Sequence, residues 1–150
     1  MRNITIIIVT LFVLGCAPQS STYAGDTVMP NTDKTAITKI NYIELPVTDM
    51  AASKVFYASA FGWTYVDYGP TYAAFEGAGI DGGLDAESDR KPSTSGALVV
   101  LYAKDLEAAV TAVETAGGLI TVQIFAFPGG RRFHFTDPSG NELAVWSEPE

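Results

Sequence analysis

The chain contains one cysteine, Cys16, and one histidine, His134, among its 150 residues. A lone cysteine excludes an intrachain disulfide and a zinc site built on several thiolates. Basic residues are also few, with nine lysines and arginines against seventeen acidic residues and a formal net charge of −8. Because a negative field repels phosphate, the composition predicts no nucleic-acid partner and makes anionic membrane surfaces poor partners.

The motifs of several common enzyme classes are absent as well. The sequence has neither a glycine-rich phosphate loop of the Walker type nor a GxSxG nucleophile elbow. Ser/His/Asp catalysis would therefore have to use His134, which lies in the stretch Arg131–Asn141 beside two arginines. Histidine is the commonest metal ligand and acid–base residue, so its role depends on partners elsewhere in the chain.

The N-terminal apolar segment, Ile4–Leu14, is short and follows the positive charge of Arg2. As a helix it would span about 16 Å, against about 30 Å for a bilayer core, which fits the apolar region of a signal peptide. The four residues Val13–Cys16, which overlap the end of this segment, resemble the lipobox of bacterial lipoproteins. The resemblance implies that residues 1–15 are a lipoprotein signal peptide and that Cys16 becomes an acylated N-terminus.

The residue after this cysteine bears on localisation. Ala17 follows instead of Asp, and in lipoproteins this implies a lipid anchor in the cell envelope, at the periplasmic face of the outer membrane. Residues 16–36 are otherwise rich in Ser, Thr, Pro, Gly and Asp, a composition that predicts a flexible tether before a domain at 37–150. An ordinary secretory signal, in which Cys16 is incidental, stays open as the alternative.

An internal repeat organises the rest of the chain. The first half predicts a helix from an Asp49 cap to about Ala60, and strands over Ile40–Val47, Trp63–Tyr68, Thr71–Glu76 and Gly79–Asp85. The second half predicts a helix over Leu106–Ala116 after Asp105, and strands over Leu98–Ala103, Leu119–Phe127, Arg131–Phe135 and Glu142–Ser147. Both halves read β-α-β-β-β.

The two halves match at an offset of 56 residues, which aligns Asp49 with Asp105, Gly62 with Gly118, and Asp81 with Asp137. A helix cap and a helix stop that recur at one offset are difficult to obtain by chance. The sequence therefore predicts an α+β fold of two tandem βαβββ modules, at about 38–93 and 94–148.

Apolar spacing also predicts which side chains are buried. The first helix should bury one stripe of side chains. The aromatic residues of both modules are expected to lie in the hydrophobic core and not to contact a ligand. These expectations concern Met50, Val55, Phe56, Tyr57, Phe61, Trp63, Phe125, Phe127, Phe133, Phe135 and Trp146. The glycine-rich and charged segments Gly77–Gly83 and Asp85–Ser95 are expected to be mobile loops.

Two stretches, VTDMAASKVFYASAFGW and FTDPSGNELAVW, resemble the vicinal oxygen chelate superfamily. This superfamily includes glyoxalase I, extradiol dioxygenases and the bleomycin- and fosfomycin-resistance proteins, and the resemblance spans about Thr38 to Glu148. It implies that each module folds its mixed sheet into half of a cup with the helices outside. The family often pairs modules between chains, so it also implies a homodimer as one arrangement.

The paired cups of the family's enzymes enclose a divalent metal, and the resemblance indicates where its ligands should be. Two first-strand positions correspond to Tyr42 and Leu98, a last-strand position to Ala144, and the fourth falls near Asp85–Glu87. Leucine and alanine have no donor atoms, so we predict no metal and no other cofactor. A shifted site that uses Glu44, Asp85 or His134 stays the alternative.

Strand alternation leaves a mostly apolar cup with one inward carboxylate, Glu44. A buried carboxylate is expected to meet a cation, and Arg132 and His134 share one strand face. Asp137–Gly140 reads as a turn. The candidate ligand-binding residues are Tyr42, Glu44, Tyr102, Arg132, His134 and Trp146.

The predicted function is binding of a small, partly apolar molecule in this cup. A metal-dependent lyase or dioxygenase-type enzyme with displaced ligands is one alternative. A non-catalytic interaction module, whose cup is filled by its own side chains, is the other.

Overall fold

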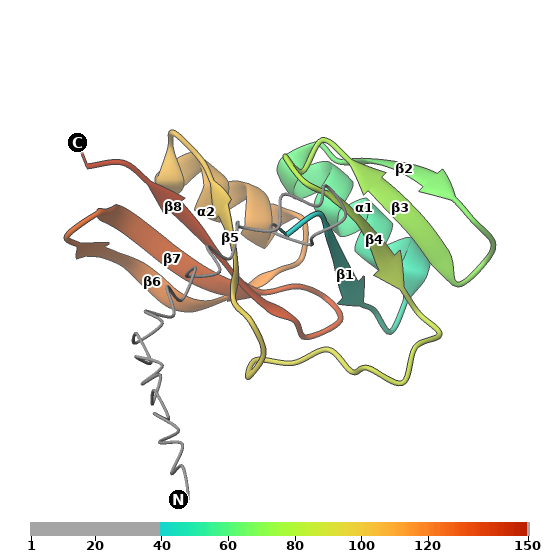
Figure 1. The fold of residues 1–150 in the computed structure, drawn as a ribbon. Coiled ribbons are helices and arrows are strands. Elements are labelled where there is room, and N and C mark those ends of the chain that lie inside the picture. Colours follow the sequence, from blue (N-terminus) through green and yellow to red (C-terminus); the bar gives the residue numbers. More distant parts are fainter. Residues whose placement is uncertain (1–39, 150) are drawn as a thin grey trace, which may run out of the picture. The chain divides into compact units, whose positions relative to one another are not determined.

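The computed structural model describes residues 40–149, and the predicted signal peptide and the whole tether, including Cys16, lie outside them. The described part contains two βαβββ modules in tandem (Figure 1). The first consists of β1 (Tyr42–Pro46), α1 (Met50–Phe61), β2 (Thr64–Asp67), β3 (Tyr72–Glu76) and β4 (Asp81–Asp85). The second consists of β5 (Val99–Tyr102), α2 (Leu106–Thr115), β6 (Leu119–Phe127), β7 (Gly130–Thr136) and β8 (Glu142–Ser147).

Each module forms one four-stranded mixed sheet, with the orders β1-β4-β3-β2 and β5-β8-β7-β6. In both sheets the first and last strands of the module pair in parallel, and the other pairs are antiparallel. The predicted α+β class and the tandem repeat are therefore confirmed. Between residues 40 and 149 no helix is long and apolar enough to cross a bilayer.

The two helix starts use the same local device, as the repeat predicts. The Asp49 carboxylate accepts the backbone N–H of Ala52, and the Asp105 carboxylate accepts that of Ala108. Each satisfies a donor that the first helical turn leaves without a partner. Gly62 ends α1 in the left-handed region at φ 74°, where a residue without Cβ is favoured.

The core lies between the helices and one face of each sheet, and it combines both modules. Phe56 and Phe61 of α1 contact Phe135 of β7, with ring centroids 6.1 and 5.7 Å apart. The predicted helix stripe is wrong at Val55, which is 65% exposed, while Ser53 is buried. Ser53 lies four residues before Tyr57 on the same helical face, and its hydroxyl bonds to that of Ser139 at 3.1 Å.

Asp137 connects the turn after β7 to the first module. Its carboxylate accepts the Tyr57 hydroxyl at 2.8 Å, the Asn141 amide at 2.9 Å, and the backbone N–H groups of Ser139, Gly140 and Asn141. The Asn141 amide also donates to the Pro46 carbonyl at 2.8 Å. Burial, and then the adjacent Asp137 charge, hold the pKa of Tyr57 well above its usual value. The predicted turn is present, and it also joins the two modules.

Two consecutive glycines in β4 admit an aromatic ring on each face of the first sheet. A Cβ at Gly82 would lie 2.1 Å from Cζ of Phe75 on the core side, and one at Gly83 would lie 2.3 Å from Oη of Tyr72 on the opposite side. Asp81–Asp85 is thus a paired strand, which confirms the strand predicted over Gly79–Asp85, and the expectation of a mobile loop through Gly83 is wrong for these residues. The glycines are needed for close packing here.

Candidate functional site

The candidate site lies on the outward faces of the two sheets, which we define as the faces opposite the core. On the second sheet the strand register arranges outward side chains in two adjacent rows. The first row is Tyr102, Trp146, Arg132 and Phe125, and the second is Val100, Ala144, His134 and Val122. Tyr102, Trp146, Arg132 and His134 are four of the six predicted candidates, and the fold brings them together.

The guanidinium of Arg132 packs against two phenylalanine rings. Its guanidinium carbon is 5.1 Å from the ring centroid of Phe125 and 5.5 Å from that of Phe127. Both phenylalanines were expected in the core. Register shifts in β6, between Ile120 and Phe125, turn these side chains to the outward face instead.

His134 is held by a carboxylate on the neighbouring strand. Its Nδ1 lies 3.1 Å from Oε1 of Glu142, and the imidazole is only 15% exposed. A neutral imidazole whose Nδ1–H donates to a carboxylate presents Nε2 as an acceptor. That Nε2 is buried and has no hydrogen-bond partner within residues 40–149.

Tyr42 and Glu44 lie on the other outward face, in a separate polar cluster. The Tyr42 and Tyr72 hydroxyls are 2.8 Å apart, and Tyr72 donates to Glu44 at 3.2 Å. Arg90 pairs with the second oxygen of Glu44 at 2.5 Å. Burial, followed by the hydrogen bond with Tyr42, raises the pKa of the Tyr72 hydroxyl above its usual value.

The predicted contact of Glu44 with Arg132 or His134 is therefore wrong. Glu44 is on β1, whereas Arg132 and His134 are on β7, which belongs to the other sheet. The segment that follows β4 brings Arg90 to Glu44 because β4 pairs with β1. His134 instead meets Glu142, which was not predicted as its partner.

The register also identifies the fourth position of the family's metal site. Val100 pairs with Ala144, and its repeat counterpart Glu44 pairs with Gly83. Gly83 is thus equivalent to Ala144, instead of a residue in the 85–87 region. The four positions hold Tyr42, Gly83, Leu98 and Ala144, of which only Tyr42 has a donor atom in its side chain. These residues do not fit the usual metal.

Nor do the residues suggested for a displaced metal site form one group. Glu44 is paired with Arg90, and His134 with Glu142. Asp85 accepts the backbone N–H groups of Glu87 and Ser88, and the bond from Glu87 is the main cause that lowers the pKa of its carboxyl. Within residues 40–149 no cluster of three or more His, Cys, Asp and Glu side chains could hold an ion.

Two pockets adjoin the outward residues. One of about 150 Å³ lies between the 93–98 segment and the His134–Glu142 pair. Another, of about 260 Å³, is lined from the first module by Glu44 and Arg90 and from the second by Glu142.

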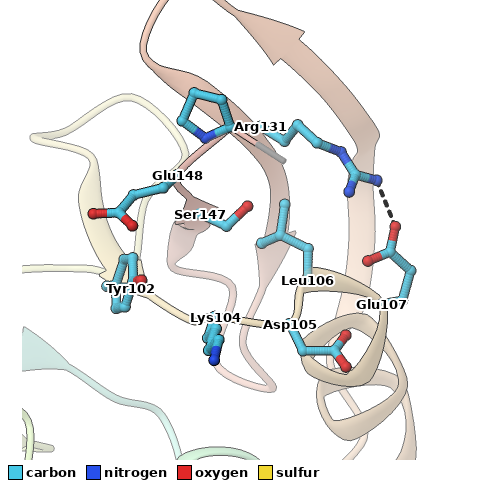
Figure 2. A pocket seen from close by; sticks show the side chains of 9 residues that line it. Tyr102, Lys104, Asp105, Leu106, Glu107, Arg131, Ser147 and Glu148 are labelled. Atoms are coloured by element: carbon cyan, nitrogen blue, oxygen red, sulfur yellow. Dashed lines mark hydrogen bonds and ion pairs between the residues drawn. The ribbon is translucent and has the colours of Figure 1, made fainter.

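A larger pocket, of about 580 Å³, lies at the start of α2 and includes Tyr102 and Ser147 (Figure 2). Figure 2 shows Arg131 pointing to Glu107 on the first turn of α2. Arg131 therefore extends to the helix side, opposite to its neighbour Arg132. The charged groups around this pocket are of both signs.

The partner residues that were not predicted differ in how strongly the sequence indicates them. Glu142 follows from the hairpin closed at Asp137–Asn141, because Phe135 pairs with Leu143 and so brings His134 and Glu142 to one face. Phe125 had no comparable signal, since a bulge cannot be read from alternation. Tyr72 and Arg90 depend on the pairing of β1 with β4, which is not local.

Comparisons with known proteins agree with this architecture. Residues 39–145 match the family model of the glyoxalase/bleomycin resistance protein/dioxygenase superfamily. The chain is 30% identical over 120 residues to proteins described as putative glyoxylase CFP32 from Mycobacterium bovis and Mycobacterium tuberculosis. The match covers 71% of this chain but 44% of those proteins, so the chain spans less than half of their length.

Solved structures share the fold at low identity. A glyoxalase/bleomycin resistance protein/dioxygenase family enzyme from Burkholderia phytofirmans has a TM-score of 0.65 at 16% identity, over 74% of this chain and 99% of that one. TnmS3, an antibiotic binding protein from a Streptomyces species, has a TM-score of 0.62 at 23% identity, over 75% of this chain and 98% of that one. With the match to the family model, the repeat and the two mixed sheets, the chain belongs to the glyoxalase/bleomycin resistance protein/dioxygenase superfamily.

Proposed function

We propose that the protein binds a small, partly apolar molecule at the outward faces of its sheets and does so without the family's divalent metal. The observation that carries the proposal is the set of residues at the four ligand positions. Gly83, Leu98 and Ala144 have no side-chain donors, and a divalent ion needs several N, O or S donors that converge at about 2 Å.

The surroundings of Gly83 support the same conclusion. Tyr72 occupies the space that a metal-ligating side chain at position 83 would need. Even a Cβ at Gly83 would lie 2.3 Å from the hydroxyl oxygen of Tyr72. The outward faces present aromatic surface with a few polar groups, which is the usual composition of a small-molecule site. TnmS3, a protein of the same fold, is described as an antibiotic binding protein, and a binding role without chemistry is consistent with that likeness.

Elemental analysis and a thermal-shift screen test this proposal together. The full chain, purified without chelator, is expected to contain well under one equivalent of divalent metal. Small aromatic compounds should raise its melting temperature equally with and without EDTA, since a ligand of the folded state raises apparent stability. Stoichiometric metal whose removal abolishes ligand binding would instead indicate a metalloenzyme with displaced ligands, and the absence of any stabilising compound would favour an interaction module.

We also propose that the protein is a lipoprotein, anchored through Cys16 at the periplasmic face of the outer membrane. The support is the Val13–Cys16 sequence after a short apolar segment and a basic residue. Cells grown with labelled palmitate should yield labelled protein in the outer-membrane fraction, and Cys16→Ala should lose the label and the membrane association. Label retained in Cys16→Ala would contradict acylation at this cysteine.

A further inference from the structure

Arg132 has no ionic partner in the described part of the chain. Its Nε is buried without a hydrogen-bond acceptor, and its guanidinium forms no ion pair within residues 40–149. The other two arginines in that range, Arg90 and Arg131, each pair with a glutamate. Arg132 is thus the one arginine of residues 40–149 that has no carboxylate partner, and unlike the exposed Lys91 and Lys104 it is partly buried.

The two phenylalanine rings beside this guanidinium do not supply the hydrogen-bond acceptors that it lacks. The rings of Phe125 and Phe127 attract the positive charge, at 5.1 and 5.5 Å from its carbon. They cannot, however, replace the oxygen acceptors that five N–H donors require. A planar guanidinium between apolar rings is partly desolvated and pre-oriented, which suits it to bind an oxyanion through two parallel hydrogen bonds.

A second unsatisfied atom lies on the same strand face. His134 is two residues from Arg132, so the two side chains emerge roughly 7 Å apart. Glu142 holds Nδ1 of His134 and leaves the buried Nε2 without a partner. In the neutral ring this nitrogen accepts, so it favours a hydroxyl or N–H group on a bound molecule. The Glu142 charge behind the imidazole disfavours a second anion at this end.

We propose that Arg132 binds an oxyanion of the ligand, a carboxylate or a phosphate, while His134 accepts a hydrogen bond from a neighbouring hydroxyl or amine. The inference rests on the proposed binding function and specifies its ligand class as small, anionic and partly aromatic. The edge-to-face pair of Tyr102 and Trp146, with ring centroids 5.3 Å apart, lies in the same row as Arg132 and offers surface to the apolar part.

Matched aromatic probes test the charge requirement. 3-Hydroxybenzoate, benzoate and phenyl phosphate are titrated into the full chain by NMR, with 3-hydroxybenzyl alcohol as the neutral counterpart of 3-hydroxybenzoate. The anionic probes are expected to bind more tightly than the alcohol and to weaken as salt is raised. 3-Hydroxybenzoate should bind more tightly than benzoate because its hydroxyl, which lies too far from its own carboxylate to bond with it, can donate to His134. The tighter of benzoate and phenyl phosphate identifies the preferred oxyanion.

Arg132→Gln should weaken binding of the anionic probes by about tenfold or more and leave the alcohol unaffected, since the lost interaction is charge-assisted. Arg132→Lys should recover part of the affinity, because it restores the charge without the planar fork. Arg131→Gln is the matched control, since it removes the same charge from the next residue on the opposite side. Thermal melts confirm that each variant is folded at the titration temperature.

The outcomes separate this inference from the proposed function. Equal binding of anionic and neutral probes, or equal losses in the Arg131 and Arg132 variants, would overturn the role of Arg132 and leave small-molecule binding intact. Failure of every aromatic probe to bind would overturn both.

Discussion

Asp137→Ala is expected to lower the free energy of unfolding by about 3–5 kcal/mol, because several donors would lose their acceptor in a buried place. Asp137 is only 4% exposed. Its removal leaves the Tyr57 hydroxyl and the N–H groups of Ser139 and Asn141 without the acceptor they now share. Chemical denaturation followed by tryptophan fluorescence measures the loss of stability. Trp63 reports on this region because its ring stacks on that of Tyr57, with ring centroids 4.6 Å apart.

The repeat supplies a matched control for this prediction. Asp81 aligns with Asp137 at the sequence offset of 56, although strand pairing makes it the structural equivalent of Glu142. It is exposed, and no hydrogen bond involves its side chain within residues 40–149. Asp81→Ala should therefore change stability by no more than about 0.5 kcal/mol. If Asp137→Ala does not fold, Asp137→Asn keeps one acceptor oxygen and should cost less. Stability unchanged in both Asp137 variants would refute the structural role and point to a functional one.

These contacts explain why a stretch that suggests an active site is mainly structural. His134 and Asp137 are close in sequence, but they belong to different environments. Asp137 is bonded to Tyr57 of the first module, and His134 is on the outward face with Glu142. The sequence could predict the turn because Asp, Pro and Gly have local preferences. It could not predict Tyr57 as the partner, since the two residues are 80 positions apart.

The fold was predictable for a related reason. Each module begins its helix with an aspartate that bonds the backbone three residues on, so the strongest signals were local and occurred twice. The ends of the strands and helices differ from the prediction by at most two residues. Repetition corrects the ambiguity of any single short apolar run.

The candidate site was predictable only where simple alternation holds. Tyr102 and Trp146 were correctly assigned to one face, because β5 and β8 are regular and pair without a shift. The competing expectation that Trp146 belongs to the core is wrong, since it lies on the outward face and is only partly buried. The contact of Arg132 with Phe125 was not predicted, because irregularities in β6 turn Phe125 outward. Glu44 was given the wrong partners, because the position of the first module's sheet relative to that of the second cannot be inferred from the alternation of residues along a strand.

Gly82→Ala is expected to destabilise the protein by about 3 kcal/mol or more, which is the cost of forcing a methyl group into a closed packing arrangement. The added Cβ would lie 2.1 Å from Cζ of Phe75 and 2.3 Å from the carbonyl oxygen of Ile43. Phe75 cannot move easily, since it is buried and packs on Trp63 at 4.6 Å. The carbonyl belongs to the paired strand β1, so relief of the clash must separate β1 from β4.

The same separation should disturb the outward face, because Gly83 pairs with Glu44 beside Tyr72. Urea denaturation measures the stability of Gly82→Ala, and Gly96→Ala is the control. A Cβ at Gly96 would meet nothing within 4 Å, and its φ is not in the left-handed region. That substitution should therefore be neutral or slightly stabilising, through the lower entropy of the unfolded chain. Equal stability of the two variants would mean that β4 is not held against β1 and Phe75 as closely as the contacts require.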